Sequence, residues 1–361
     1  MTELAAALRA RIASAGPLTV AQYMAEALGH PQLGYYTGRD PLGRDGDFIT
    51  APEITQVFGE LLGLWCLDYW RCLGSPDPFI LVEAGPGRGT LMADALRAAA
   101  LDPDFLATAQ IYLVETSPAL RGLQEEVLRD HEVTWVESLD HIAGEAPLLL
   151  LANEFLDALP VRQFQRADDG WRERLVGLAP EAGSFCFCLD DRPVSLPHVL
   201  NTPEIMQAPP GAIAETCPAA TAFVSQLAAR LGRHGGAALM VDYGHTRSAT
   251  GDTLQALHGH RPCAVFEEPG AVDITAHVDF AALAAAALAA GAHVHGPRPQ
   301  GAFLRELGIE ARTARLAETV PEEARQLLES GCRRLISRDE MGVLFKTLAI
   351  TGAPQPVPAG Y

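Results

Sequence analysis

The sequence predicts an α/β fold built around a mostly parallel sheet. Beyond residue 78, short apolar runs alternate with helical patterns, which is typical of βαβ units. The run Leu148–Ala152 is continuously hydrophobic, as expected of a parallel strand covered on both faces. A glycine-rich segment, Gly85–Gly89, separates the first apolar run from a helical pattern. We therefore expect a Rossmann-like sheet with a ligand crevice at the carboxyl ends of its strands.

Residues 1–75 are expected to form a helical layer on this sheet. Helical periodicity over residues 1–30 ends before Pro31, and a turn-rich stretch follows. Apolar side chains then recur at helical spacing over Ile54–Tyr69. Thr50 and Glu53 have the spacing of a capping box at the start of that helix. Such a layer could serve as a lid over the ligand crevice.

The core elements follow in order along the chain. Five strands are expected at Phe79–Glu83, Ile111–Glu115, Val133–Val136, Leu148–Ala152 and Ala237–Asp242. A last strand is expected at Val343–Ile350. Helices are expected at Thr90–Ala99, Pro118–Arg129, Phe280–Ala290, Phe303–Leu307 and Pro321–Ser337. Residues 76–160 and 235–352 would form this core.

An inserted α+β subdomain is expected at residues 161–234. The fourth and fifth core strands are roughly 80 residues apart, which is too long for a simple loop. The intervening segment alternates like small antiparallel strands and then becomes helical. Its expected elements are Val161–Arg166, Trp171–Leu178, Ser184–Leu189 and Ala219–Gly232.

The composition disfavours several classes of partner. The chain has 361 residues, with 27 Lys and Arg against 45 Asp and Glu, and a formal net charge of −18. This charge repels phosphate backbones and anionic lipids, so we expect no nucleic-acid partner and favour a basic protein or a cationic ligand. The longest apolar run, Phe280–Ala292, is too short for a membrane span.

Cysteine and histidine spacing predicts neither a disulfide framework nor a metal site. The seven cysteines form no C-x-x-C pair, and the His-x-His pairs lack acidic or cysteine companions at ligand spacing. The N-terminal residues lack the apolar stretch of a secretory signal. We interpret them as an amphipathic helix of a cytoplasmic, bacterial protein.

The glycine segment predicts a cofactor. Its spacing is G-x-G-x-G, and Thr90 stands where a dinucleotide fingerprint needs glycine. The acid Glu83 precedes it by two residues and suits a cation better than a pyrophosphate. S-adenosylmethionine (SAM) is such a ligand, because its ammonium and sulfonium groups are positively charged. The expected contacts from this segment are Glu83, Gly85, Pro86, Gly87 and Gly89.

Acids at the next two strand ends extend this prediction. Glu115 ends the second strand, close to the ~20-residue spacing from the glycines that ribose recognition uses. Thr116 and Ser117 follow it. The third strand ends at Glu137 and Ser138, either of which could accept from the adenine amine. Singly, strand-end acids can be merely solvated, but the ordered set favours a SAM site.

Residues at the ends of the fourth and fifth strands are candidates for binding the methyl acceptor, and we call this part of the crevice the acceptor side. Asn153 and Glu154 could hold an acceptor nitrogen, or could cap a helix. Asp157 follows in the same segment. Asp242, in the segment Asp242–His245, could be a second acid in the crevice or could simply mark a strand exit.

Together these stretches resemble the MidA-like family of SAM-dependent methyltransferases, which includes a mitochondrial complex I assembly arginine methyltransferase. The resemblance spans nearly the whole chain. The glycine loop is common to many methyltransferases, whereas two of the segments, Gly46–Glu60 and Asn153–Val161, are specific to this family. The other matching segments are Thr19–Met24, Gly34–Tyr36, Glu83–Leu91, Asp242–His245 and Met341–Gly342.

The resemblance implies a seven-stranded class I methyltransferase sheet and arginine N-methylation of a complex I subunit during assembly. It implies catalytic roles for Asn153, Glu154, Asp157 and Asp242, and adds Thr50, Pro52 and Asn153 to the cofactor contacts. Two alternatives are a small-molecule methyltransferase and a noncatalytic SAM-binding assembly chaperone. A nicotinamide-dependent oxidoreductase is disfavoured by Thr90.

Overall fold

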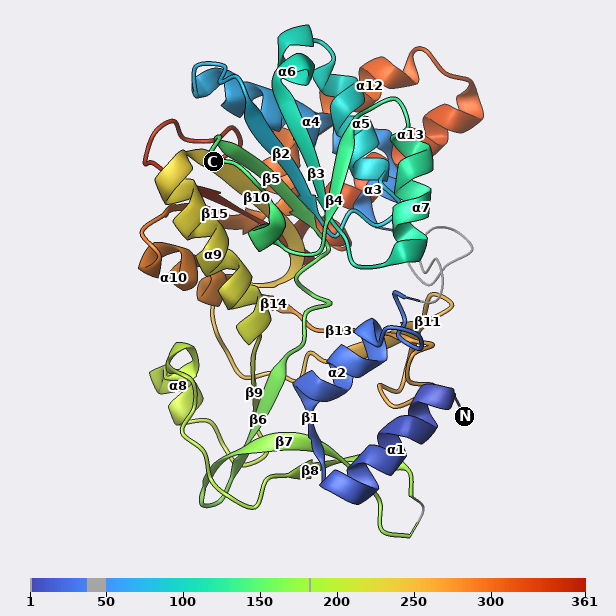
Figure 1. The fold of residues 1–361 in the computed structure, drawn as a ribbon, viewed down its shortest axis with the longest axis vertical. Helices are drawn as coiled ribbons and strands as arrows, with labels where there is room; N and C mark the ends of the chain where they lie inside the picture. Colours follow the sequence, from blue (N-terminus) through green and yellow to red (C-terminus); the bar gives the residue numbers. More distant parts are fainter. Residues whose placement is uncertain (1, 38–49, 182) are drawn as a thin grey trace. The chain divides into compact units, whose positions relative to one another are not determined.

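The computed structural model describes residues 2–37, 50–181 and 183–361 (Figure 1). The chain divides into two compact units, each assembled from three separate segments. Unit 1 comprises residues 1–48, 157–222 and 247–282, and unit 2 comprises residues 49–156, 223–246 and 283–361. The boundaries of these two units differ from the boundaries of the three parts that were expected from the sequence.

Unit 2 holds the main sheet, with strand order β15-β16-β10-β5-β2-β3-β4. The pairs β4–β3, β3–β2, β2–β5 and β5–β10 are parallel, whereas β10–β16 and β16–β15 are antiparallel. The sheet is therefore mixed, with parallel strands where sequence predicted them. Its strands are β2 Phe79–Ala84, β3 Ala109–Val114, β4 Val133–Val136, β5 Leu148–Asn153, β10 Gly236–His245, β15 His293–Pro299 and β16 Phe345–Thr351.

Unit 2 also contains several helices, and all of those given next except α7 contribute residues to one large apolar core with the sheet. They are α3 Ala51–Ile54, α4 Gln56–Cys72, α5 Thr90–Ala99, α6 Pro103–Thr108, α7 Pro118–Val127, α11 Gln300–Glu306, α12 Ile309–Ala317, α13 Glu322–Ile336 and α14 Met341–Leu344, with a 3-10 turn at Leu139–His141. Two further helices, α9 Pro218–His234 and α10 Phe280–Ala289, begin in segments of unit 1 and continue in segments of unit 2.

Helix α4 crosses α5 at close range through two glycines. A Cβ on Gly63 would lie 2.3 Å from the carbonyl oxygen of Ala95, and one on Gly59 would lie 2.6 Å from the Cβ of Asp94. Both glycines are buried. Because α5 begins directly after the glycine loop, this crossing fixes the helix that supports the loop.

Unit 1 consists of two small antiparallel sheets and short helices. One sheet has the order β1-β7-β6-β9 with β8 on β7, and the other has the order β12-β11-β13. The strands of these sheets are β1 Leu18–Thr19, β6 Arg162–Ala167, β7 Gly170–Leu178, β8 Phe185–Leu189, β9 Ile213–Thr216, β11 Gln255–His258, β12 Arg261–Cys263 and β13 Asp273–Thr275. The short strand β14 Val278–Asp279 belongs to neither small sheet. The helices of unit 1 are α1 Glu3–Ala15, α2 Val20–Gly29 and α8 Pro203–Met206, with a 3-10 turn at His198–Leu200.

The N-terminal prediction needs two corrections. The periodic segment 1–30 forms two helices, because Gly16 with φ +91° ends α1 and β1 follows. The capping box is wrong: Thr50 makes no side-chain cap bond, and the hydroxyl of Thr55 instead accepts from the N–H of Val57 at the start of α4. Thr55 has φ −160° and separates α3 from α4.

The single layer expected over residues 1–75 is also divided between the units. Helices α1 and α2 pack with the unit 1 core, whereas α3 and α4 belong to unit 2. Near the other end of the chain, the last strand begins at Phe345 because residues 341–344 form α14. The strands that were not expected are β1, β9, β11, β12, β13, β14 and β15.

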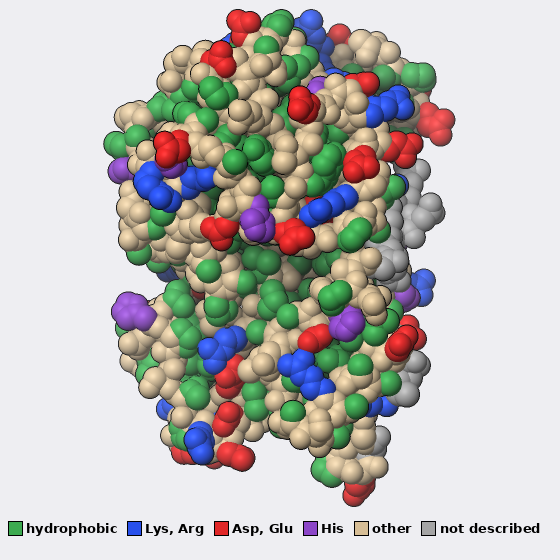
Figure 2. Space-filling view, viewed as in Figure 1, with side chains coloured by type: hydrophobic (Ala, Val, Ile, Leu, Met, Phe, Trp, Pro, Cys, Tyr) green, Lys and Arg blue, Asp and Glu red, His purple; other side chains and the backbone are tan. Residues whose placement is uncertain are grey.

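The surface in view carries both signs of charge. Figure 2 shows Asp and Glu side chains interspersed with Arg and His across this face, so the net negative charge is not gathered there into one patch. Among the described residues, no helix combines the length and apolar character that crossing a membrane requires.

Candidate functional site

The glycine loop between β2 and α5 adopts a backbone that favours glycine. Gly85, Gly87 and Gly89 have φ values of +67°, +54° and +85°. A Cβ on Gly85 would lie only 2.8 Å from a ring carbon of Phe155. Gly89 is the N-cap of α5, with no side-chain cap bond. The loop thus presents bare backbone at a helix N-terminus, as a close-fitting ligand requires.

Glu83 is a buried acid beside which no counter-charge stands in the described part of the chain. It is 2% exposed, and its Oε2 has no hydrogen-bond partner among the described residues. Burial raises its pKa to about 8, the charge of Glu115 adds to the rise, and the N–H of Met92 opposes it. Such a group gains most from a cation brought by a ligand.

Glu115 directly follows β3, and hydrogen bonds orient its carboxylate. Its Oε1 accepts from the N–H groups of Thr116 at 2.8 Å and Ser117 at 2.7 Å. Its Oε2 accepts from Nε2 of Gln124 at 3.2 Å. Burial raises the pKa of Glu115 despite these bonds. Since a carboxylate oxygen can accept two hydrogen bonds, Oε2 retains capacity for a ligand hydroxyl.

Gln124 is a site residue that the sequence analysis missed. This fully buried amide on α7 also donates to the carbonyl of Gly87 at 2.6 Å and accepts from Nε1 of Trp135 at 2.8 Å. It therefore ties the glycine loop to Glu115. The signal available in sequence was its place between Leu120 and Leu128 on the apolar face of a helix, where a polar residue needs a buried partner.

Strand register aligns the predicted positions. The neighbouring residues across the sheet are Ala84, Val114, Val136 and Ala152. The residues that directly follow are Gly85, Glu115, Glu137 and Asn153. Register thus places Glu137, rather than Ser138, in line with Glu115. Glu137 is exposed, and the hydroxyl of Ser138 lies 3.4 Å from Nδ1 of His141.

Asn153 and Glu154 stand together at the end of β5. Nδ2 of Asn153 donates to Oε1 of Glu154 at 3.1 Å, while its buried Oδ1 has no partner in the described part of the chain. Oε1 of Glu154 also accepts from the N–H of Ala51, the first residue of α3, at 2.9 Å. Glu154 has φ +49°, which costs a non-glycine residue free energy and often marks a functional position.

The two predicted aspartates occupy different units. Asp242 is 1% exposed, and its oxygens accept from the N–H groups of Leu156 at 3.0 Å and Tyr243 at 2.9 Å. It therefore shapes the segment that follows Glu154. Asp157 belongs to unit 1, where its carbonyl accepts from the N–H of Ala276 at 3.0 Å. Of the four expected catalytic residues, Asn153, Glu154 and Asp242 thus lie in unit 2 and Asp157 in unit 1.

Thr50 and Pro52 lie at the start of α3. The carbonyl of Thr50 accepts from the N–H of Glu53 at 2.9 Å, and Pro52 is buried. Oε1 of Glu53 accepts from the hydroxyl of Thr90, the first residue of α5, at 2.5 Å. The segment 38–49, which is part of the lid expected over residues 1–75, lies outside the described residues.

The residues present fit a cationic nucleoside ligand such as SAM. Glu83 and Asn153 each have a buried oxygen without a partner in the described residues. The backbone of Gly85–Gly89 has positive φ at all three glycines and leads into the N-terminus of α5. At the adjacent strand end, the carboxylate of Glu115 is oriented by the N–H groups of Thr116 and Ser117. A polar, cation-accepting set of this kind matches the charge and hydroxyl groups of the cofactor.

Comparison with known proteins decides the family. Residues 61–298 match Methyltransf_28, a family of S-adenosyl-L-methionine-dependent methyltransferases. The chain belongs to this family. A superfamily member from Burkholderia thailandensis, solved bound to S-adenosyl-homocysteine (SAH), is 33% identical with a TM-score of 0.84, covering 99% of this chain and 93% of that one.

Curated relatives extend over almost the whole chain. "Protein arginine methyltransferase NDUFAF7, mitochondrial" of Danio rerio is 38% identical over 369 residues, covering 95% of this chain and 85% of the relative. The Homo sapiens protein of the same name is 36% identical over 366 residues, covering 94% and 81%. The cofactor and the enzyme class predicted from sequence are confirmed.

The names of these relatives correct the predicted location. They are mitochondrial proteins of animals, which contradicts the expectation of a cytoplasmic, bacterial protein. That expectation was drawn from an N-terminal sequence without an apolar signal stretch. Such a pattern argues against a secretory signal and does not distinguish the remaining compartments.

Proposed function

We propose that this methyltransferase is a protein arginine N-methyltransferase that acts on a subunit of respiratory complex I during assembly. The observation that carries the proposal is the 38% identity, over 95% of the chain, to a relative named as a protein arginine methyltransferase. The acidic chain, with a net charge of −18, also favours encounter with a basic partner.

The proposed cofactor contacts follow the strand ends. SAM, which supplies an electrophilic methyl group when bound, would be held by the backbone of Gly85–Gly89. Glu83 would bind its ammonium and Glu115 its ribose, through the oxygen that still has capacity. Glu137 or Ser138 would accept from the adenine amine, and register favours Glu137. We include in the proposal that the sheet is the seven-stranded class I type, with an insertion between β5 and β10.

Asn153 and Glu154 form the proposed acceptor side. A guanidinium stays protonated and is a weak nucleophile, so the site must align one nitrogen and accommodate the positive charge. The unpartnered Oδ1 of Asn153 offers an acceptor, and Glu154 beside it offers negative charge. Asp242 is a positioning residue in this scheme, because it binds the backbone of the same segment.

The test combines the full chain with isotopically labelled SAM and complex I subunits from cells that lack this protein. Mass spectrometry should find label on arginine. Glu154→Gln should reduce transfer at least ~100-fold while SAH affinity is kept, since the amide retains the oxygen that accepts from Ala51. Glu145→Gln, at an exposed acid, is the matched control.

Three outcomes would contradict this function. Label on small acceptors but never on arginine would favour a small-molecule methyltransferase. SAH binding without transfer to any acceptor would favour the noncatalytic chaperone. Near-normal transfer by Glu154→Gln would remove Glu154 from the acceptor side.

A further inference from the structure

Helix α3 makes two hydrogen bonds to other parts of unit 2, and a glutamate carboxylate takes part in each. Oε1 of Glu154 accepts from the N–H of Ala51 at 2.9 Å, at the first residue of the helix. From within the helix, Oε1 of Glu53 accepts from the hydroxyl of Thr90 at 2.5 Å. Ala51 and Glu53 both belong to α3, so the two hydrogen bonds connect Glu154 to Thr90 through this helix. All four residues belong to unit 2.

One end of this path reaches the cofactor loop. Thr90 immediately follows Gly89, and it is the residue that breaks the dinucleotide fingerprint. Glu53 was expected to cap its own helix, but its carboxylate reaches across to α5. The Glu53–Thr90 bond therefore fixes α3 against the point where the glycine loop becomes a helix.

The other end of the path reaches the acceptor side. Glu154 has a left-handed backbone, and its own N–H donates to the carbonyl of Val241 at 2.9 Å. The same Oε1 that holds Ala51 also accepts from Asn153. Any displacement of α3 thus changes the hydrogen bonding of the carboxylate that the proposed function places beside the acceptor.

We propose that Glu53 is a positioning residue and that α3 energetically couples the cofactor loop to Glu154. The proposal rests on the proposed function, in which Gly85–Gly89 hold SAM and Glu154 faces the acceptor. Cofactor bound at the glycine loop would restrict the position of Thr90. Thr90 restricts α3 through its hydrogen bond to Glu53, and α3 restricts the carboxylate of Glu154 through the N–H of Ala51. By linkage, loosening Glu154 must then weaken cofactor binding by the same free energy.

Calorimetry of SAH binding to the full chain tests the coupling without any methyl acceptor. Thr90→Val, which keeps the shape and removes the hydroxyl, should weaken binding about 10-fold, while Thr90→Ser should stay within about 2-fold of the wild type. Glu53→Ala should match Thr90→Val. Rescue by serine separates the hydrogen bond from general packing at this position.

Glu154 supplies the decisive comparison. Glu154→Ala should weaken SAH binding about 5-fold to 10-fold, whereas Glu154→Gln, which keeps an acceptor for Ala51, should leave it unchanged. In the Thr90→Val background, Glu154→Ala should cost no more than 2-fold further, because the path is already broken. Additive losses in the double variant, or an unchanged affinity in Glu154→Ala, would overturn the proposal.

Hydrogen exchange keeps the test decisive if Glu154→Ala does not fold. In the wild type, SAH should slow exchange of the Ala51 amide, and in Thr90→Val it should not. Equal protection in both proteins would refute the coupling. Because every measurement uses SAH alone, failure of arginine methylation and failure of the coupling give different results.

Discussion

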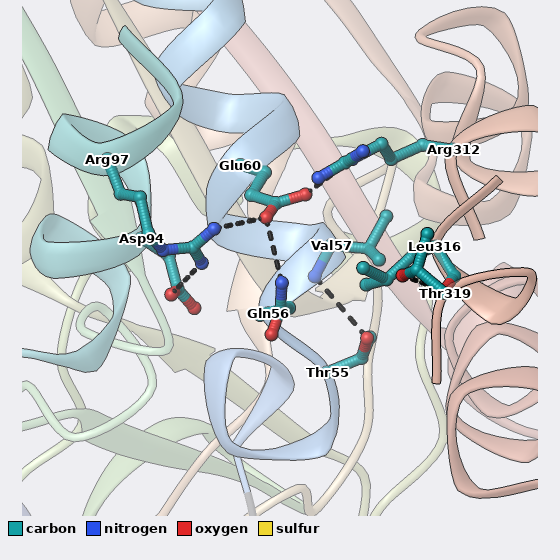
Figure 3. Close-up of polar contacts among 9 residues, drawn as sticks. All are labelled: Thr55, Gln56, Val57, Glu60, Asp94, Arg97, Arg312, Leu316 and Thr319. Carbon is teal, nitrogen blue, oxygen red and sulfur yellow. Dashed lines mark hydrogen bonds and ion pairs between the residues drawn. The ribbon is translucent and has the colours of Figure 1, made fainter. Parts of the chain in front are cut away.

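Two equally buried glutamates in unit 2 have opposite surroundings. Glu83 on β2 and Glu60 on α4 are each 2% exposed. Glu60 is contacted by Arg97 at 2.5 Å, Arg312 at 2.7 Å and Gln56 at 2.9 Å (Figure 3). Burial acts to raise the pKa of Glu60, but these donors hold it below its ordinary value. Burial raises that of Glu83 to about 8, and no counter-charge from the described residues opposes the rise.

The difference separates an acid paired within the chain from one that the proposed function assigns to the cofactor. Glu60 joins three helices, because Arg97 comes from α5 and Arg312 from α12. Its charge is neutralised within the chain. No residue of the described chain neutralises Glu83, and in the proposed function the ammonium of the cofactor would supply there what the two arginines supply to Glu60. Burial alone therefore does not distinguish an acid paired within the chain from a candidate ligand-binding acid.

The largest expected effect concerns SAH binding by Glu83. Since the ammonium of the ligand favours the ionised acid, affinity should rise about 50-fold between pH 6 and pH 8 and then level off. Glu83→Gln should bind weakly with a flat profile over this range. Calorimetry at several pH values measures both. A flat wild-type profile, or a sloping one in Glu83→Gln, would assign the ammonium to another group.

A smaller effect is expected at Gln124, which hydrogen-bonds to Gly87 and Glu115 of the candidate cofactor site. Gln124→Leu leaves the Gly87 carbonyl and the Trp135 N–H without their partner, so SAH affinity should fall about 10-fold. Gln300→Leu is the matched control, since Gln300 is also fully buried but donates to the carbonyl of Leu335. An equal loss of affinity in both variants would reduce the Gln124 effect to general destabilisation.

The smallest effects are those on thermal stability, where the two glutamates should differ in sign. The contribution of Glu83 is largest at acid pH and falls as pH rises toward 8, because the unfolded chain releases this proton at lower pH than the folded chain does. The contribution of Glu60 is present at neutral pH and is lost as pH falls through its lowered pKa.

Melting temperatures of the ligand-free chain from pH 4 to pH 8 measure this contrast. Relative to the wild type, Glu83→Gln should gain stability as pH rises. Glu60→Gln should melt about 3 °C or more below the wild type at pH 7, with a smaller difference at pH 4. Parallel pH curves for the two variants would show that the arginines around Glu60 have no net effect.

The parallel strands could be predicted because their sequence matches their burial. Leu148–Asn153 is buried at every residue, as its continuous apolar run indicates. Strand β15 could not be predicted, because His293–Pro299 becomes a strand only by pairing with β16 from far along the chain. The single N-terminal helix was wrong because a periodic pattern continued past Gly16.

The positions of the candidate site could also be predicted, but not the partners of each side chain. The strand ends predicted from sequence place Glu83, Glu115 and Asn153 at one edge of the sheet, and the structure has them there; their roles toward the cofactor stay a prediction. That Glu53 reaches Thr90 depends on α3 lying against α5, which no local pattern encodes. The capping-box spacing fitted Glu53 equally well, and tertiary packing decided between the two.

The close crossing of α4 and α5 also bears on the order of folding. These helices flank β2 in one continuous stretch of chain, so their contacts close short loops. In unit 1, by contrast, Leu18 pairs with Val176, and three distant segments must meet. We therefore expect the helices around the glycine loop to assemble early, and the small sheets of unit 1 to form after them.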